Sequence, residues 1–197
     1  INAFSINGLS NLSDIQFQAF NTIQINALSS YQIGNLNFSQ ITYILTNIKP
    51  LPIASLTSSQ LPILTPTQIK NLTASEITLI NPNAIQGLPP ASFLSFSVKQ
   101  LNALTTIQIY NFTASQIASL PINKFILLRT TQVAAINPLS VSTLSSLQIV
   151  KLPLTQIYAF SPSTINELQI NYLYPSQINS LIPSQFSNIS PTQISNL

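Results

Sequence analysis

An eight-residue repeat runs through almost the whole chain and constrains its fold more than any other feature. Written from Thr65 in eights, the sequence reads TPTQIKNL, TASEITLI, NPNAIQGL and onward, and 23 such octads can be aligned. Position 5 of the octad is apolar in all 23, and so is position 8. Two breaks in register interrupt the array, at residues 45–48 and 169–173. A short and regular period predicts a solenoid, in which each repeat packs on its neighbours.

The octad contains a complete helix-start signal. In TPTQIKNL, Thr65 suits a helix N-cap because its hydroxyl can accept a backbone N–H, and Pro66 suits the first helical position. Gln68 can reach back to the N–H of the cap and complete a capping box. Position 4 is glutamine in 15 octads, and nine of the 14 prolines stand at position 2. We interpret the glutamines as caps; a ladder of stacked side-chain amides along a fibre is the alternative.

The repeat excludes both one long helix and a plain strand. Prolines at this density would break a continuous helix at a cost of about 3 kcal/mol each. Apolar residues spaced by three and then five do not alternate as they do in a strand. We therefore expect an all-α fold, an α-solenoid of very short helices whose positions 5 and 8 face a central seam. A β-solenoid with one strand per octad is the alternative, although the chain has just three glycines for tight turns.

The spacing of prolines and aromatic residues bears on the number of octads in one coil. Proline recurs after 16 residues at positions 50, 66 and 82, and after 32 residues at positions 89, 121 and 153. These spacings favour an even number of octads per coil. The pair Tyr110 and Phe112 recurs after 48 residues as Tyr158 and Phe160, which also permits three octads per coil.

The repeat predicts one continuous array over residues 1–197. The chain begins with a half octad, in which Ile1 and Phe4 take positions 5 and 8, and it closes on a full octad. Solenoids usually carry atypical polar repeats at their ends. Since neither end has one, we expect a segment of a longer array or a filament subunit.

Composition removes several kinds of chemistry. The chain has no histidine and no cysteine, and only 5% of its residues are charged. Zinc fingers, Ser-His-Asp triads and thiol centres are therefore excluded. The acids Asp14, Glu76 and Glu167 lie many octads apart, so we expect no two-carboxylate site. We predict a protein that is not an enzyme, with no catalytic, cofactor-binding or metal-binding residues and no cofactor.

The charge and apolar patterns also bear on partners. A net charge of +3 is too small to compete for a phosphate backbone, so no nucleic acid is expected. The apolar residues are too scattered for a membrane span. We interpret Glu76 as a capping acid and Asp14 as a first-turn acid. The neighbouring cations Lys124 and Arg129 are predicted to lie on a solvated face.

The motif Asn-x-Ser/Thr recurs along the chain. Four of its five occurrences place asparagine at position 7, and the fifth places it at position 1. In a chain secreted by a glycosylating cell these bends would be natural acceptors of N-linked glycans. The possible N-glycosylation sites are Asn11, Asn37, Asn71, Asn111 and Asn188.

The pattern favours a structural role. We expect an extracellular or cell-surface filament, fibre or stalk whose partners are copies of itself, arranged head to tail or laterally. The alternative is an adhesin-like module that presents a surface rich in Ser, Thr, Asn and Gln to a glycan or another surface. In that case the register breaks at residues 45–48 and 169–173 are the candidate binding faces. For the seam itself, Ile117→Ala should cost about 2–5 kcal/mol, and Ser115→Ala should lie within about 0.5 kcal/mol.

Overall fold

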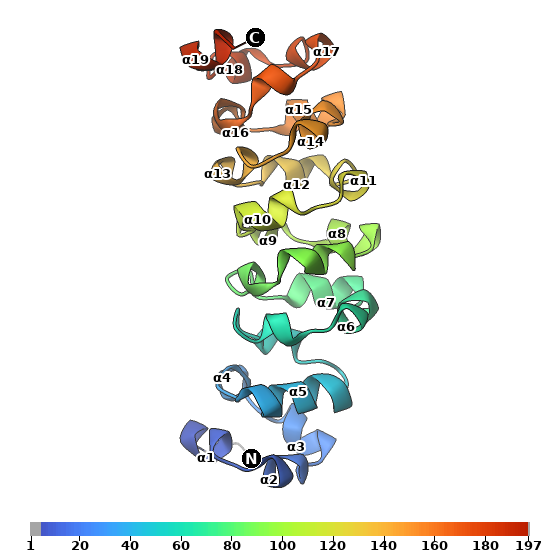
Figure 1. Ribbon diagram of the computed structural model, residues 1–197. Helices are drawn as coiled ribbons and strands as arrows, with labels where there is room; N and C mark the ends of the chain where they lie inside the picture. Colours follow the sequence, from blue (N-terminus) through green and yellow to red (C-terminus); the bar gives the residue numbers. More distant parts are fainter. Residues whose placement is uncertain (1–4, 197) are drawn as a thin grey trace. The chain divides into compact units, whose positions relative to one another are not determined.

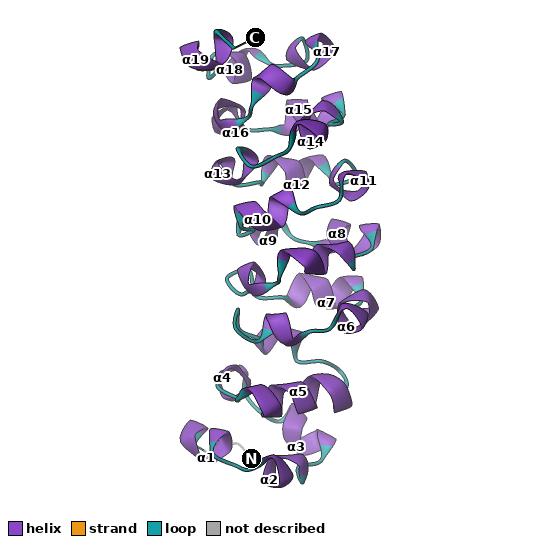
Figure 2. Ribbon diagram, in the orientation of Figure 1, coloured by secondary structure: helices purple, strands orange, loops and turns teal. Residues whose placement is uncertain are grey.

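The computed structural model describes residues 5–196 of the chain, and these residues form two compact units. The first unit extends to Leu88 and the second begins at Pro89. In each unit the chain is built of short helices joined by bends, and residues 5–196 contain no strand (Figure 2). The α-solenoid prediction is confirmed, and the β-solenoid alternative is wrong for the described residues. Ile1, Phe4 and Leu197, which the repeat assigns to seam positions, lie outside them.

The first unit contains seven α-helices and three 3-10 turns within its described residues. In chain order they are α1 (Ile6–Ser10), α2 (Asp14–Gln18), α3 (Thr22–Asn26), α4 (Ser30–Gly34), α5 (Phe38–Asn47), η1 (Ile53–Ser55), η2 (Leu61–Ile63), α6 (Pro66–Asn71), α7 (Ala74–Leu79) and η3 (Ile85–Gly87). Most are single turns, and α5 is the longest, with ten residues.

The second unit contains twelve α-helices and two 3-10 turns within its described residues, in successive layers (Figure 1). They are η4 (Pro90–Leu94), α8 (Val98–Ala103), α9 (Thr106–Tyr110), α10 (Ala114–Ala118), α11 (Ile122–Phe125), α12 (Thr130–Ala134), α13 (Pro138–Val141), α14 (Ser146–Val150), α15 (Leu154–Ala159), α16 (Pro162–Glu167), η5 (Ile170–Tyr172), α17 (Pro175–Ile178), α18 (Pro183–Phe186) and α19 (Pro191–Ile194).

The helices begin where the capping signals predict. Thr65 has an extended backbone, and its side chain accepts a hydrogen bond from the N–H of Gln68 at 3.3 Å. The Gln68 side chain in return accepts from the N–H of Thr65 at 2.8 Å. The same exchange occurs at Thr113 and Gln116, at the start of α10. Apart from α5, the helices end after one to two turns because the next capping signal follows within eight residues.

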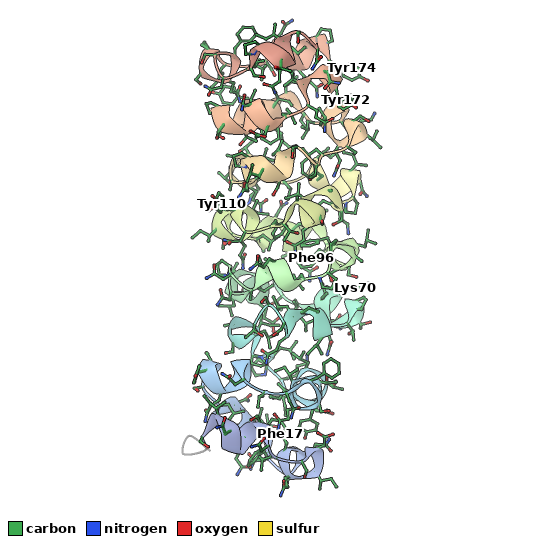
Figure 3. The ribbon with its side chains drawn as sticks, turned by 60° about the vertical axis from the view of Figure 1, so that its left-hand side comes forward. Phe17, Lys70, Phe96, Tyr110, Tyr172 and Tyr174 are labelled. Carbon is green, nitrogen blue, oxygen red and sulfur yellow. The ribbon has the colours of Figure 1, made fainter. Side chains whose placement is uncertain are left out.

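The core is the row of residues at positions 5 and 8. From Leu9 to Ile165, the position-5 side chains are buried, and most position-8 side chains are buried beside them. Ile117 is fully buried and Ser115 is exposed, as the repeat assigns them. Large apolar side chains at positions 2, 3 and 6, such as Leu139 and Tyr110, remain exposed. Figure 3 shows Phe96 inside the ribbon and Tyr110 pointing outward.

One coil takes between three and four octads. In the second unit α13 packs on α10, and α16 packs on α13, so each helix lies against the third helix before it. Gln132 donates hydrogen bonds to the carbonyls of Leu101 and Leu104, which are 31 and 28 residues earlier in the chain. Both acceptors lie in the second half of the octad 97–104, which is the fourth octad before that of Gln132. The proline spacings favoured an even number of octads per coil, and the structure does not show one. The packing of each helix on the third helix before it is closer to three octads per coil.

Both register breaks are octads that have lost their helix-start half. Residues 45–48 retain two apolar side chains spaced by three, Leu45 and Ile48, and both are buried. Because no capping signal precedes them, α5 continues through Leu45 to Asn47. Residues 169–173 likewise retain Ile170 and Leu173, both buried, on the turn η5. The breaks therefore shorten a coil without exposing its seam.

Candidate functional site: the position-4 row between coils

The glutamine side chains at position 4 have two roles at once. Through Oε1, 14 of the 15 accept the N–H of the first residue in their own octad. This is the capping role that the sequence predicted. Through Nε2, many of them also donate to backbone carbonyls of the preceding coil. Sequence reasoning missed this second role.

The bonds between coils are regular. Gln132 Nε2 donates to the carbonyls of Leu101 at 2.8 Å and Leu104 at 2.9 Å. These acceptors are position 5 and position 8 of the fourth octad back. The same kind of donation is made by Gln40, Gln60, Gln68, Gln148, Gln156, Gln177, Gln185 and Gln193. In these nine octads the amide bonds to backbone rather than to another glutamine, so the stacked-amide ladder is wrong for them.

The row connects helix ends that would otherwise lack partners. The last carbonyls of a helix have no intrahelical donor, and a buried carbonyl without a donor is costly. A position-8 carbonyl such as that of Leu120 ends its octad and accepts from Gln148, the position-4 glutamine of a later coil. One amide group therefore caps the start of one helix and satisfies the end of another. Gln132 and Gln185 are fully buried while doing so.

Lys124 takes the place of a glutamine at position 4. Its Nζ donates to the carbonyls of Leu94 at 2.9 Å and Phe96 at 2.6 Å, with Phe93 at 3.5 Å. These carbonyls occupy the place in their coil that receives a glutamine amide elsewhere. The predicted solvated face is therefore wrong for Lys124, because a half-buried ammonium donates between coils. Arg129 is exposed, and its guanidinium donates to the carbonyl of Leu104 at 3.3 Å.

Two further octads differ at this row. Gln156 donates to Leu128 at 2.8 Å, but its buried Oε1 has no hydrogen-bond partner. The first residue of that octad is Pro153, which has no N–H to donate. Glu76 accepts the N–H of Thr73 at 2.8 Å and confirms the predicted capping acid. Asp14 is exposed in the first turn of α2, as predicted.

The octad has a direction, since position 4 faces the preceding coil and position 5 faces the following one. In the first described coil Gln16 and Gln24 are exposed while Phe17 and Ile25, one residue later, are buried. In the last described coil the order is reversed, and Gln185 is 0% exposed while Phe186 is 53% exposed. Each coil therefore presents amide donors on one face and position-5 side chains on the other.

The five predicted glycosylation sites differ in the hydrogen bonds that their side-chain amides make. Asn37 Nδ2 donates to the carbonyl of Ser10 at 3.2 Å, and its Oδ1 caps α5. The amides of Asn111 and Asn188 donate to carbonyls of their own helices at 2.9 Å. Asn11 and Asn71 have exposed side chains at the ends of α1 and α6. Glycosylation at all five remains a prediction.

A surface groove of about 630 Å³ lies on the second unit, between α12 and α15. Leu154, Tyr158 and Ala159 form one wall, and Thr131 and Ala134 form the other. Its lining residues carry no charge. The groove lies over regular octads, so it does not coincide with either register break.

The described residues contain no group of three or more His, Cys, Asp or Glu side chains that could hold a metal ion. Within residues 5–196, none of the helices has the length and apolar character needed to cross a bilayer. No model of a known protein family matches the chain, and no curated protein is similar to it in sequence.

Proposed function

We propose that the chain is a non-enzymatic structural protein, a module of an extracellular or cell-surface filament, fibre or stalk built by stacking octad coils. The observation that carries the proposal is the recurrence of one contact, the donation from position 4 to the preceding coil, from Gln40 to Gln193. Most apolar side chains at positions 5 and 8 of the described residues are buried. In a chain organised in this way, the repeated residues of the octad stabilise the packing of one coil on the next.

The surface supports the same role. Only nine charged residues occur among 197, so repulsion between copies is weak. Ser, Thr, Asn and Gln supply much of the exposed polar surface instead. A surface with few titratable groups suits a fibre that meets varying pH and salt outside a cell, which is the basis for the proposed location.

Immunogold electron microscopy of the producing cells tests this function. Antibodies raised against the 197-residue chain should label filaments, fibres or stalks at or beyond the cell surface. Labelling confined to the cell interior, or a diffuse label with no extended structure, would contradict the proposal. An antibody against an unrelated surface protein provides the control for accessibility.

The groove on the second unit favours a second candidate function, an adhesin-like module. Its uncharged wall of Leu154 and Tyr158 beside the threonines of α12 would suit the apolar face of a sugar ring. Binding of a glycan array by the wild-type chain, with loss of binding in Tyr158→Ala, would favour this function. Equal binding by Tyr110→Ala, which alters an exposed tyrosine outside the groove lining, would serve as the control.

A further inference from the structure

The charged residues of the chain are divided unequally between its two units. The first unit has two cations and two acids, so its side chains carry no net charge. The second unit has one acid and four cations, and these cations are Lys99, Lys124, Arg129 and Lys151. The net charge of +3 therefore belongs to the second unit. Its three lysines stand in different octads, and successive lysine octads are three octads apart.

The first two lysine octads lie one on the other, because a coil takes close to three octads. Lys124 donates to the carbonyl of Phe96 at 2.6 Å, immediately before the octad of Lys99. Arg129 donates to the carbonyl of Leu104, the last residue of that octad, at 3.3 Å. The octad of Lys124 ends at the residue before Arg129, so it lies along the octad of Lys99.

The third lysine octad continues the column. Gln148 belongs to it and donates to the carbonyl of Leu120 at 3.2 Å. Gln156, in the next octad, donates to the carbonyl of Leu128 at 2.8 Å. These two acceptors precede and end the second lysine octad, so the third octad lies along the second. The helices of these two octads, α11 and α14, are in contact.

This column of octads carries exposed basic and aliphatic side chains. We call it the lysine face and define it as residues 97–104, 121–129 and 145–152. Leu127 is 51% exposed and Leu147 is 55% exposed. The acid of the second unit, Glu167, lies on α16, which packs on α13 instead. The other exposed cations and aliphatic residues of the face are Lys99, Arg129, Lys151 and Val98.

We propose that the lysine face binds the surface of an anionic lipid bilayer. Anionic headgroups attract lysine and arginine, and exposed aliphatic side chains enter the boundary between headgroups and acyl chains. Lysine suits this boundary because its methylene stem lies along apolar surface while its ammonium reaches the headgroups. An acidic polysaccharide would engage the cations but leave Leu127 and Leu147 in water, so the aliphatic residues favour the bilayer. This partner goes beyond the proposed structural function and does not depend on it.

One double substitution removes charge from the lysine face. Lys99→Gln with Lys151→Gln neutralises two exposed ammonium groups and retains Lys124, whose Nζ donates between coils. Its control is Lys49→Gln with Lys70→Gln, which changes the net charge by the same amount in the first unit. The comparison separates the position of the charge from its total.

A second double substitution removes the aliphatic contacts. Leu127→Ser with Leu147→Ser changes side chains that are already half exposed, so the fold should be retained. Its control is Ile107→Ser with Leu139→Ser, which alters exposed residues of α9 and α13 outside the lysine face. Circular dichroism identical to that of wild type establishes that all four variants are folded.

Cosedimentation with vesicles measures the binding of the full 197-residue chain. Wild type and both controls should bind vesicles of equal parts phosphatidylglycerol and phosphatidylcholine, and should bind pure phosphatidylcholine about tenfold more weakly. The lysine variant should lose about tenfold in affinity for the anionic vesicles. The leucine variant should also lose about tenfold, because less apolar area enters the bilayer. Added salt should weaken the binding of wild type.

Three outcomes would overturn the proposal. One is a wild-type chain that does not bind the anionic vesicles. Another is an equal loss of binding in Lys49→Gln with Lys70→Gln, since total charge rather than the lysine face would then decide binding. The third is a loss in the lysine variant with full binding by the leucine variant. Competition by dextran sulfate would in that case identify an acidic polysaccharide as the partner.

Discussion

Two neighbouring octads of the second unit, that of Lys124 and that of Gln132, connect to the preceding coil with different side chains. Both side chains donate to carbonyls 28 and 31 residues earlier. Gln132 also accepts the N–H of Arg129 at 3.0 Å, which lysine cannot do because its ammonium has no acceptor. In the lysine octad the first residue is Pro121, which has no N–H to offer. The two substitutions therefore compensate for each other, and donation to the preceding coil is the role they preserve.

Both octads have a fully buried apolar side chain at position 5, Phe125 and Val133. We therefore expect substitution at this position to have the largest effect on stability. Phe125 is fully buried, and Phe125→Ala should lower the free energy of unfolding by about 3–5 kcal/mol because it leaves a cavity in the seam. Chemical denaturation followed by circular dichroism measures the change. Asn123→Ala, an exposed position in the same octad, should stay within about 0.5 kcal/mol. Similar losses for both variants would contradict the assignment of the inward face.

Substitution of Gln132 separates its two roles. Gln132→Leu removes both, and it should cost about 2–4 kcal/mol because the N–H of Arg129 loses its acceptor and the carbonyls of Leu101 and Leu104 each lose a buried donor. Gln132→Lys reproduces the neighbouring octad's donor and should lose about 1 kcal/mol, the value of one capping bond. The same denaturation measurement ranks the two variants. A lysine variant as unstable as the leucine variant would mean that donation between coils contributes little.

A double-mutant cycle on Pro121 and Lys124 tests their compensation. Lys124→Gln alone should leave its Oε1 without a partner, as occurs at Gln156 beside Pro153. Pro121→Ser alone should leave a backbone N–H without its usual glutamine. Combining them restores the common octad, so we expect a favourable coupling of about 1 kcal/mol between the two sites. Additive free energies of unfolding would show that the two positions are independent.

The smallest effect should be a gain in stability at Pro153. Pro153→Ser provides an N–H for the buried Oε1 of Gln156 and a hydroxyl for the helix start, and it should raise the free energy of unfolding by about 0.5–1 kcal/mol. The gain is reduced because proline restricts the unfolded chain. Pro89→Ser is the matched control, because Ser92 rather than glutamine stands at its position 4. Thermal melting measures both changes, and a loss of stability in Pro153→Ser would contradict this explanation.

The local fold could be read from the sequence because its signals are local. Thr65, Pro66 and Gln68 define a helix start within four residues, and the apolar pairs at positions 5 and 8 define the inward face. The register breaks were visible in the sequence too. Whether the buried seam continues through a break depends on which apolar residues the break retains. In residues 169–173, Ile170 and Leu173 preserve the spacing of three, and the seam continues through them.

The role of the position-4 row could not be read from the sequence, because it depends on how many octads close a coil. The donor of Gln132 and its acceptor Leu104 are 28 residues apart, and no local signal connects them. For the same reason Lys124 resembled a solvated cation in sequence. A partial signal did exist, since Pro121 precedes Lys124 by three residues and removes the N–H that a glutamine would accept.

Hydrogen exchange of the glutamine side-chain amides, followed by NMR, tests the central claim most directly. If position 4 donates to the preceding coil, the Nε2 protons of Gln132, Gln148 and Gln185 should exchange far more slowly than those of exposed Gln16 and Gln24. The exchange rates should be measured at a protein concentration low enough that the chain is monomeric. Equally fast exchange at all five side chains would contradict the claim that these amides hold one coil to the next.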